Sequence, residues 1–287
     1  MGIRGLYTYL KYYRKAFDLK DNKKPLLRIG IDAMSFLYRY RENTEEINLC
    51  LNTLKAQGHK ILFIFDGKPP VEKDTEIESR KAHRETAANS AIAIQTFLES
   101  QSAKEIDNSS LQLIEDSLKR CQTKSWNVSR NLRRAFQDLL WDSNIPYVKS
   151  LSEADDVIID LFKADKLDVI ISSDMDYIVA GITCLWVPNR RGPLYFEEIT
   201  LDNVLQGENL NSQQLMEVGI LASNLQCSTA FTWVRHYGSI ENIMKTNLLE
   251  NRPIDVLQGL KRFMNQPAYS RIRPDHLERV KEFLDRL

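Results

Sequence analysis

Three stretches of the chain are too continuously apolar to be half-exposed strands, and each lies next to aspartates. They are Leu26–Asp32, Ile61–Asp66 and Asp168–Ser173. Runs of this kind are typical of buried parallel strands. Apolar residues at helical spacing over about 33–57 and 153–164 predict helical crossovers between such strands. We therefore expect an α/β fold with a mostly parallel central sheet between helices.

The remaining segments show other patterns. Residues 3–17 have apolar positions at helical spacing among basic residues, which predicts a basic amphipathic helix. Residues 67–144 are polar and helical without a strand pattern, and the turn-like stretch 100–110 joins two helices. Residues 185–196 read as a hairpin with Asn-Arg-Arg-Gly at its turn, and helical patterns continue from about residue 200.

Composition limits the classes of protein to which this chain can belong. With 287 residues, 43% of them hydrophobic, the chain can form one large or two modest domains with a real core. Lys+Arg and Asp+Glu both total 39, so any surface that attracts nucleic acid must arise from local arrangement. The four cysteines lie far apart without CxxC spacing, which argues against structural zinc and fits a reducing intracellular compartment. No apolar run is long enough to span a membrane.

Acidic residues follow the predicted strands and begin one predicted helix. Ligands of parallel sheets bind at the carboxyl ends of the strands, where these side chains would converge although they are scattered in sequence. Close carboxylates repel one another unless cations lie among them, and Mg²⁺ or Mn²⁺ takes oxygen ligands. The set comprises Asp32, Asp66, Glu153, Asp155, Asp174 and Asp176.

These acids also have an ordinary interpretation. Ser152 is a good N-cap, Ser152-x-x-Asp155 is a capping box, and acidic residues are favoured in any first helical turn. One such aspartate would most often be a turn or cap residue. Its repetition at three strand ends favours the metal site.

Lys73, Arg80 and Arg84 fall on one face of a predicted helix. Several glutamates intervene, so the residues alone favour a solvated helix face over a phosphate-binding one. Both interpretations stay open at this point.

Five short motifs, in order, resemble those of the flap endonuclease / XPG (Rad2-like) family of structure-specific 5′ nucleases. They are Met1-Gly-Ile-Arg-Gly-Leu, Ile31-Asp-Ala-Met-Ser, Phe65-Asp-Gly-Lys-Pro-Pro, Ser152-Glu-Ala-Asp-Asp and Ser173-Asp-Met-Asp. Each is weak alone, but five in order at sensible spacing form a strong signal. The resemblance covers about residues 1–225, interrupted by an insertion, and indicates a divergent member for which a viral source would be no surprise.

The resemblance implies the PIN-like 5′-nuclease fold, a mostly parallel sheet between helices. It also implies a helical arch insertion, through which a single-stranded 5′ end passes, and a helical C-terminal part. We accordingly expect an N-terminal nuclease region over 1–100 that includes the start of the arch, arch helices over 101–135, an internal nuclease region over 136–225, and a helical region over 226–287 with a reduced helix-turn-helix.

The resemblance also implies roles for particular residues. Asp32, Asp66, Glu153 and Asp155 would hold one metal ion and Asp174 with Asp176 a second, with Asp156 extending the acidic cluster behind them. Lys73 and Arg80 would stabilise charge on the scissile phosphate. The expected DNA contacts are Gly2 at a close backbone approach, Tyr38 stacking on a base, and Arg84.

Two departures from the family pattern stand out. Asn224 occupies the place of a further metal-binding aspartate, which weakens the expected second metal. The glycine-containing element that grips duplex phosphates is missing, so the duplex clamp is expected to be reduced. No sliding-clamp box is present at the C-terminus.

We therefore expect a monomeric 5′ nuclease with two Mg²⁺ or Mn²⁺ ions that cleaves DNA with a 5′ single-stranded end or flap in replication, recombination or repair. The compartment would be the nucleus, the cytoplasm or, for a viral protein, the site of genome replication. One alternative, indicated by Asn224, is a nuclease-like scaffold that binds nucleic acid without efficient catalysis. A relative that cleaves RNA is another.

Overall fold

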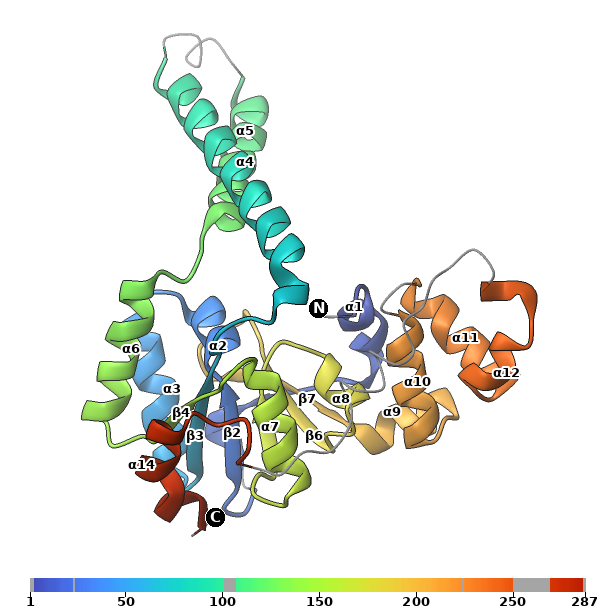
Figure 1. Ribbon diagram of the computed structural model, residues 1–287. Helices are drawn as coiled ribbons and strands as arrows, with labels where there is room; N and C mark the ends of the chain where they lie inside the picture. Colours follow the sequence, from blue (N-terminus) through green and yellow to red (C-terminus); the bar gives the residue numbers. More distant parts are fainter. Residues whose placement is uncertain (1–2, 23, 101–106, 223–224, 250–268, 286–287) are drawn as a thin grey trace. The chain divides into compact units, whose positions relative to one another are not determined.

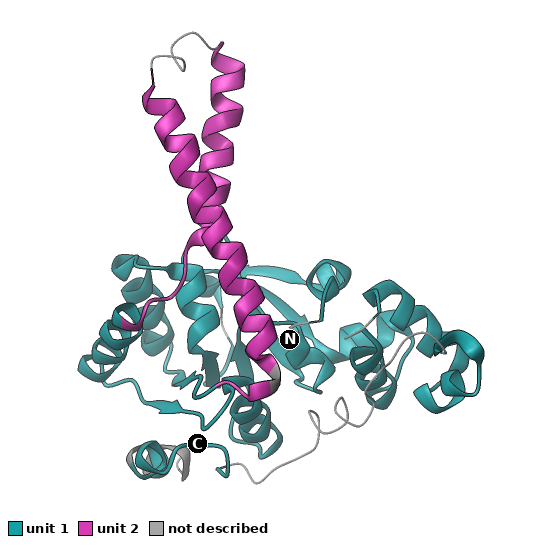
Figure 2. Ribbon diagram, turned by 45° about the horizontal axis from the view of Figure 1, so that its top comes forward, with its two compact units in different colours: residues 1–68, 131–287 teal, residues 69–130 magenta. Residues whose placement is uncertain are grey.

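The computed structural model describes residues 3–22, 24–100, 107–222, 225–249 and 269–285. The chain divides into two compact units, coloured separately in Figure 2: residues 1–68 with 131–287, and residues 69–130. The first unit contains the sheet, and the second is helical. The four regions expected from the sequence divide the chain differently and remain predictions.

Within the described residues, a seven-stranded sheet forms the centre of the first unit, in the order β1-β7-β6-β5-β2-β3-β4 (Figure 1). The strands from β6 to β4 in this order are mutually parallel, whereas β7 pairs antiparallel with β6 and β1 antiparallel with β7. Their bounds are β1 Lys15–Asp18, β2 Arg28–Asp32, β3 Lys60–Phe65, β4 Tyr147–Lys149, β5 Val169–Ile171, β6 Cys184–Pro188 and β7 Tyr195–Thr200. The predicted sheet, its three buried strands and the hairpin are confirmed.

Helices cover both faces of the sheet. On β3, Leu62 and Ile64 belong to the apolar cluster of α7, whereas Phe63 contacts the rings of Phe36 and Phe136. Alternate residues of a strand point to opposite faces, so β3 is buried on both. The helices are α1 Leu6–Tyr9, α2 Ala33–Tyr40, α3 Thr44–Ala56, α6 Arg130–Asp142, α7 Ala154–Lys163, α8 Asp176–Val179, α9 Leu201–Glu208, α10 Ser212–Ala222, α11 Cys227–Tyr237, α12 Ile240–Met244 and α14 Pro274–Asp285, with 3₁₀ helices η1 Leu10–Tyr13, η2 Leu19–Asp21 and η5 Asn247–Leu249.

The second unit consists of η3 Val71–Lys73, α4 Asp74–Glu99 and α5 Asn108–Ser125. The two long helices pack against each other. Asp107 caps α5, because its Oδ1 accepts hydrogen bonds from the backbone N–H groups of Ser109 and Ser110 at 3.0 Å each. The predicted helical insertion is therefore confirmed.

In the part of the chain that the structure describes, no helix could cross a membrane.

The expectation of one helix over residues 3–17 is wrong at its C-terminal end. Helical structure ends at Tyr13, and Lys15–Asp18 instead pairs with Tyr195–Glu198 at the sheet edge. Phe17 packs there against Trp186 and Phe196. Pairing with a strand distant in sequence thus overrides the local helical spacing. The strand β4 also forms by pairing with a strand distant in sequence, β3. Its three residues are too few to show a periodic pattern in the sequence.

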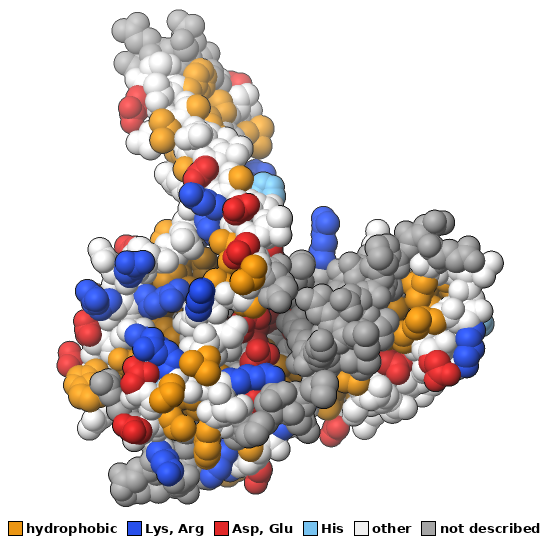
Figure 3. Space-filling view, viewed as in Figure 1, with side chains coloured by type: hydrophobic (Ala, Val, Ile, Leu, Met, Phe, Trp, Pro, Cys, Tyr) orange, Lys and Arg blue, Asp and Glu red, His pale blue; other side chains and the backbone are white. Residues whose placement is uncertain are grey.

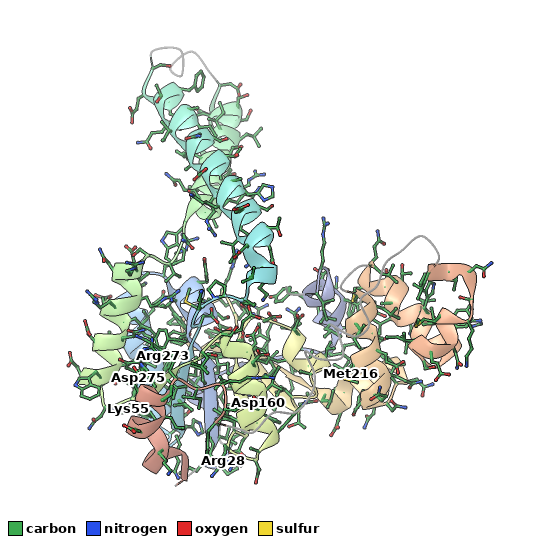
Figure 4. All side chains as sticks on the ribbon, viewed as in Figure 1. Arg28, Lys55, Asp160, Met216, Arg273 and Asp275 are labelled. Carbon is green, nitrogen blue, oxygen red and sulfur yellow. The ribbon has the colours of Figure 1, made fainter. Side chains whose placement is uncertain are left out.

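A charged contact joins the starts of β2 and β5. Asp168, just before β5, accepts hydrogen bonds from the Arg28 guanidinium through both carboxylate oxygens, at 2.6 and 3.0 Å, and from the Arg28 backbone N–H at 2.8 Å. Figure 4 labels Arg28 at the lower end of the sheet. Hydrogen bonds from Arg28 hold the pKa of Asp168 below its usual range. Asp168 is therefore stabilised in its charged form when the chain folds.

We predict that Asp168→Asn lowers the free energy of unfolding by about 1–3 kcal/mol at pH 7, since it weakens hydrogen bonds to a charged group. The loss should shrink below about pH 4, because an aspartate with a lowered folded-state pKa stabilises the fold above its unfolded pKa and loses this effect as pH falls through the folded value. Urea denaturation of the native protein and the variant, at pH 7 and below about pH 4, measures the loss at each pH.

Asp165→Asn is the matched control. Asp165 contacts the same guanidinium at 3.0 Å, but its side chain is 93% exposed, so its loss should cost less than about 1 kcal/mol. Equal losses for the two variants would contradict this account.

Candidate functional site

The predicted acidic residues lie at or after the ends of three strands, or at the starts of two helices. Asp32 is the last residue of β2, Asp66 directly follows β3, and Asp174 follows β5. Glu153 occupies the N-cap position of α7, with Asp155 in its first turn, and Asp176 begins α8. Acidic side chains gather near the N-terminal end of α7 in Figure 3.

Backbone close contact fixes the loops that carry two of these acids. The N–H of Gly67 donates to the carbonyl of Ser152 at 2.6 Å. A Cβ atom at Gly67 would lie 2.1 Å from the carbonyl oxygen of Ser150, so only glycine fits. The Oδ1 of Asp66 accepts a hydrogen bond from the N–H of Ala154 at 2.9 Å. The end of β3 and the start of α7 are thereby joined.

The capping interpretation holds for Asp32 and fails for Ser152. Asp32 caps α2, because its Oδ1 accepts from the N–H groups of Met34 and Ser35 at 3.0 Å each. Ser152 is not the N-cap of α7, contrary to the sequence prediction: Glu153 takes that position and makes no capping hydrogen bond. The carbonyl of Ser152 accepts from the N–H of Gly67, and Asp66, directly after β3, accepts from the first N–H of the helix.

The carboxylates lie close enough to affect one another's ionisation. Removal from water, then the charges of Asp155 and Asp66, raise the pKa of Asp32 above its usual range. Removal from water, then the charges of Asp174, Asp66 and Glu153, raise the pKa of Asp155. The charged groups that act most strongly on both are therefore carboxylates.

Sequence reasoning missed two residues that contact this cluster. The hydroxyl of Tyr177 donates to Oδ1 of Asp155 at 2.5 Å, and burial next to these carboxylates raises the pKa of Tyr177 well above its usual value. The hydroxyl of Ser172 donates to Oδ2 of Asp32 at 3.0 Å and accepts from the N–H of Asp174 at 3.1 Å. The only sequence signal was their position beside the Ser173-Asp-Met-Asp motif.

Asp176 holds the N-terminal segment. Its Oδ1 accepts a hydrogen bond from the N–H of Ile3 at 2.8 Å, and its own N–H donates to Oδ1 of Asp174 at 3.0 Å. Gly2, for which a close approach to DNA was predicted, lies outside the described residues, as does Asn224. The start of the described chain is thus anchored at the acidic cluster.

Asp156 pairs with an arginine of the C-terminal segment. The Arg271 guanidinium lies 3.3 Å from Oδ1 of Asp156 and 3.6 Å from Oδ2 of Asp160, which is labelled on α7 in Figure 4. The carbonyl of Arg271 also accepts from the N–H of Leu151 at 2.7 Å. This contact compensates two further charges of α7.

Tyr38, which is predicted to stack on a base, lies on α2 and is 44% exposed.

The predicted cations belong to the second unit. Lys73 ends η3, and Arg80 and Arg84 lie on α4. Arg80 forms an ion pair with Glu76, one helical turn away. Their roles toward a phosphate remain predictions.

The chemistry of the acidic cluster fits a hard divalent cation. All its donors are carboxylate oxygens, which Mg²⁺ and Mn²⁺ prefer, and the raised pKa values of Asp32 and Asp155 show a place where positive charge would be stabilised. Among the described residues, no group of three or more Asp, Glu, His or Cys side chains is arranged so that it could hold a metal ion. Mg²⁺ commonly keeps several waters and uses substrate phosphates as ligands, so an incomplete protein set is compatible with it.

Known proteins are similar to this chain. The family model of the XPG I-region matches residues 144–224. Flap endonuclease 1 from Lodderomyces elongisporus is 26% identical over 286 residues, covering 85% of this chain and 68% of that protein. Flap endonuclease 1-A from Physcomitrium patens is 30% identical over 217 residues, covering 71% of this chain and 50% of that protein. The chain thus spans between half and about two thirds of these relatives.

Solved structures agree on the fold. The catalytic core of Rad2 in complex with DNA substrate has a TM-score of 0.63 at 16% identity, covering 99% of this chain and 95% of that one. Flap endonuclease-1 from Methanococcus jannaschii has a TM-score of 0.57 at 16% identity, covering 99% and 93%. At these identities the likeness supports the fold.

We predict that Tyr177→Phe destabilises the protein by about 1–3 kcal/mol at pH 8 and by less at pH 5. The hydroxyl stabilises the charged form of Asp155, so its removal costs most when that carboxylate is ionised. Urea denaturation at the two pH values measures the difference.

Tyr40→Phe is the matched control, because Tyr40 is also buried but donates to the uncharged carbonyl of Pro193 at 2.7 Å. Its cost should be nearly equal at both pH values. The same pH dependence in both variants would contradict this role of the Tyr177 hydroxyl.

Proposed function

We propose that this chain, which belongs to the flap endonuclease / XPG family, is a divalent-metal-dependent nuclease that cleaves DNA with a 5′ single-stranded end or flap. The observation that carries the proposal is the convergence of carboxylates from the ends of β2, β3 and β5 and the start of α7. Such a cluster is costly unless it binds cations. Relatives named flap endonucleases support the reaction, and the Rad2 structure with DNA supports the class of substrate.

We assign Asp32, Asp66, Glu153 and Asp155 to one Mg²⁺ or Mn²⁺ ion, and Asp174 with Asp176 to a second. Bound ions would supply a nucleophilic water at neutral pH and stabilise the attacking and leaving oxygens of the phosphodiester. No side chain has to act as a covalent nucleophile.

Residues of the chain itself keep these carboxylates in place. Tyr177 fixes one oxygen of Asp155, and Ser172 fixes one oxygen of Asp32. Asp66 holds the first turn of α7 through the N–H of Ala154. Each of these contacts leaves at least one face of a carboxylate for other ligands, because an ionised carboxylate accepts several bonds. The cluster is thereby oriented before substrate arrives.

The proposal extends to the residues that would contact DNA. Lys73 and Arg80 would stabilise charge on the scissile phosphate, while Gly2, Tyr38 and Arg84 would position the strand. Asp156 would act from behind the ligands, where it pairs with Arg271. We further propose a monomer in a reducing intracellular compartment where its free cysteines stay reduced.

A second candidate is a nuclease-like scaffold that binds nucleic acid with weakened catalysis. Asn224, in the place of a metal-binding aspartate, is the sequence feature that favours it. A neutral amide binds a dication less tightly than a carboxylate does. A third candidate is an enzyme that cleaves RNA, so the cleavage assay includes a matching RNA substrate.

We predict that Asp174→Asn lowers the rate of cleavage of a 5′-labelled flap DNA by at least about 100-fold, because a metal ligand is lost. DNA binding and folding should change little. The assay compares flap, single-stranded and duplex DNA with a matching RNA, in Mg²⁺, Mn²⁺ or EDTA.

Asp202→Asn, at an exposed aspartate of α9, is the control and should cleave like the native protein. Cleavage in EDTA, or unchanged rates in Asp174→Asn, would remove the metal assignment. A folded protein that binds DNA but cuts no substrate would favour the scaffold.

A further inference from the structure

A pocket of about 550 Å³ lies between η1 and α9, in the first unit. We call it the η1–α9 pocket. Its volume is in the range of small-ligand sites. It is lined by Tyr12, Tyr13, Arg14, Lys15, Asn203, Gln206 and Gly207.

One wall of the η1–α9 pocket is fixed by contacts within the protein. The hydroxyl of Tyr13 donates to Oε1 of Glu208 at 2.6 Å. A Cβ at Gly207 would lie 2.2 Å from the Tyr13 ring, so glycine is needed for this close packing. Arg14 forms an ion pair with Glu197 at 3.1 Å. Tyr13 and Arg14 therefore form a preorganised surface.

The other lining residues are exposed and chemically mixed. Tyr12 is 81% exposed, and Lys15, Asn203 and Gln206 are exposed as well. Together they offer an aromatic ring, an ammonium group and two amides. The lining includes two cations and no carboxylate. This combination matches the parts of a nucleotide: a base to stack, polar base edges and a phosphate.

We propose that the η1–α9 pocket binds an unstacked nucleotide of a single DNA strand that extends from the acidic cluster. The base would stack on Tyr12, the amides of Asn203 and Gln206 would contact its edge, and Lys15 would contact a phosphate. This inference rests on the proposed function for its substrate. A nucleotide within a duplex would bind this pocket less well than an unstacked one, because its base is already stacked on its neighbours.

The chain provides a continuous route from the acidic cluster to the pocket. The N–H of Ile3 is bonded to Asp176, and the helical turns of α1 and η1 lead from there to Tyr12. At 1.5–2 Å per helical residue and about 3.4 Å per extended one, this segment spans at most about 20 Å. That corresponds to at most about six nucleotides, since ~3.4 Å is the spacing of a fully stacked strand. Arg4, in the turn before α1, and Lys11, on η1, are both exposed along it.

The test measures DNA affinity in EDTA by fluorescence anisotropy, with substrates whose single-stranded segment is about 2 or about 12 nucleotides long. Tyr12→Ala should raise the Kd of the long-segment substrate about 10-fold and that of the short-segment substrate less than about 2-fold. Tyr12→Phe should keep native affinity, because the ring remains. Tyr195→Ala, at a 41% exposed tyrosine outside the pocket, is the control.

A second measurement addresses the phosphate contact. Lys15→Ala should reduce the slope of log Kd against log salt by about one for the long-segment substrate only, and Lys20→Ala, at an exposed lysine of η2, should not. Equal effects of Tyr12→Ala on both substrates, or on a blunt duplex, would overturn the pocket assignment. So would native affinity in Tyr12→Ala.

The outcomes separate this inference from the proposed nuclease. Metal-dependent cleavage of flap DNA together with unchanged binding in Tyr12→Ala would leave the nuclease and remove the nucleotide pocket. A length-dependent loss in Tyr12→Ala, in a protein that cleaves nothing, would keep the pocket and remove the nuclease.

Discussion

Repulsion among carboxylates is the constraint on which the arrangement of this protein depends. Three parallel strands and one helix bring acidic side chains to the same edge of the sheet, where removal from water and neighbouring negative charges raise the pKa values of Asp32 and Asp155. A fold keeps such a cluster only if the surrounding packing is strong enough to oppose it. The strands β2, β3 and β5 are buried, which provides that packing.

The contacts around the cluster each limit its movement or its charge. The approach of Gly67 to the loop before α7 and the bond from Ala154 to Asp66 join two elements that carry acids. Arg271 pairs with two more acids of α7, so that these charges do not add to the cluster. The chain therefore concentrates negative charge at one place and compensates it beside that place.

The sequence predicted the parts that depend on local pattern. Continuous apolar runs located β2, β3 and β5, and their order indicated that the aspartates beside them would meet. It did not predict β1 or β4, because their pairing partners lie far away in sequence. Tyr177 was missed for the same reason: its contact with Asp155 bridges α8 and α7. The predicted cap at Ser152 was wrong: the helix begins one residue later, and Asp66, which directly follows β3, bonds its first N–H.

The most direct test of the central claim is thermal unfolding of the native protein and Asp155→Asn at pH 8, in EDTA and in Mn²⁺. The variant removes a repelled charge while its amide oxygen can still accept the Tyr177 hydroxyl, so in EDTA we expect its Tm to be higher, by about 2–4 °C for each kcal/mol of relieved repulsion. Mn²⁺ should raise the Tm of the native protein more than that of the variant. A variant that is less stable in EDTA, with an equal response to Mn²⁺, would show that these carboxylates do not form a cation site.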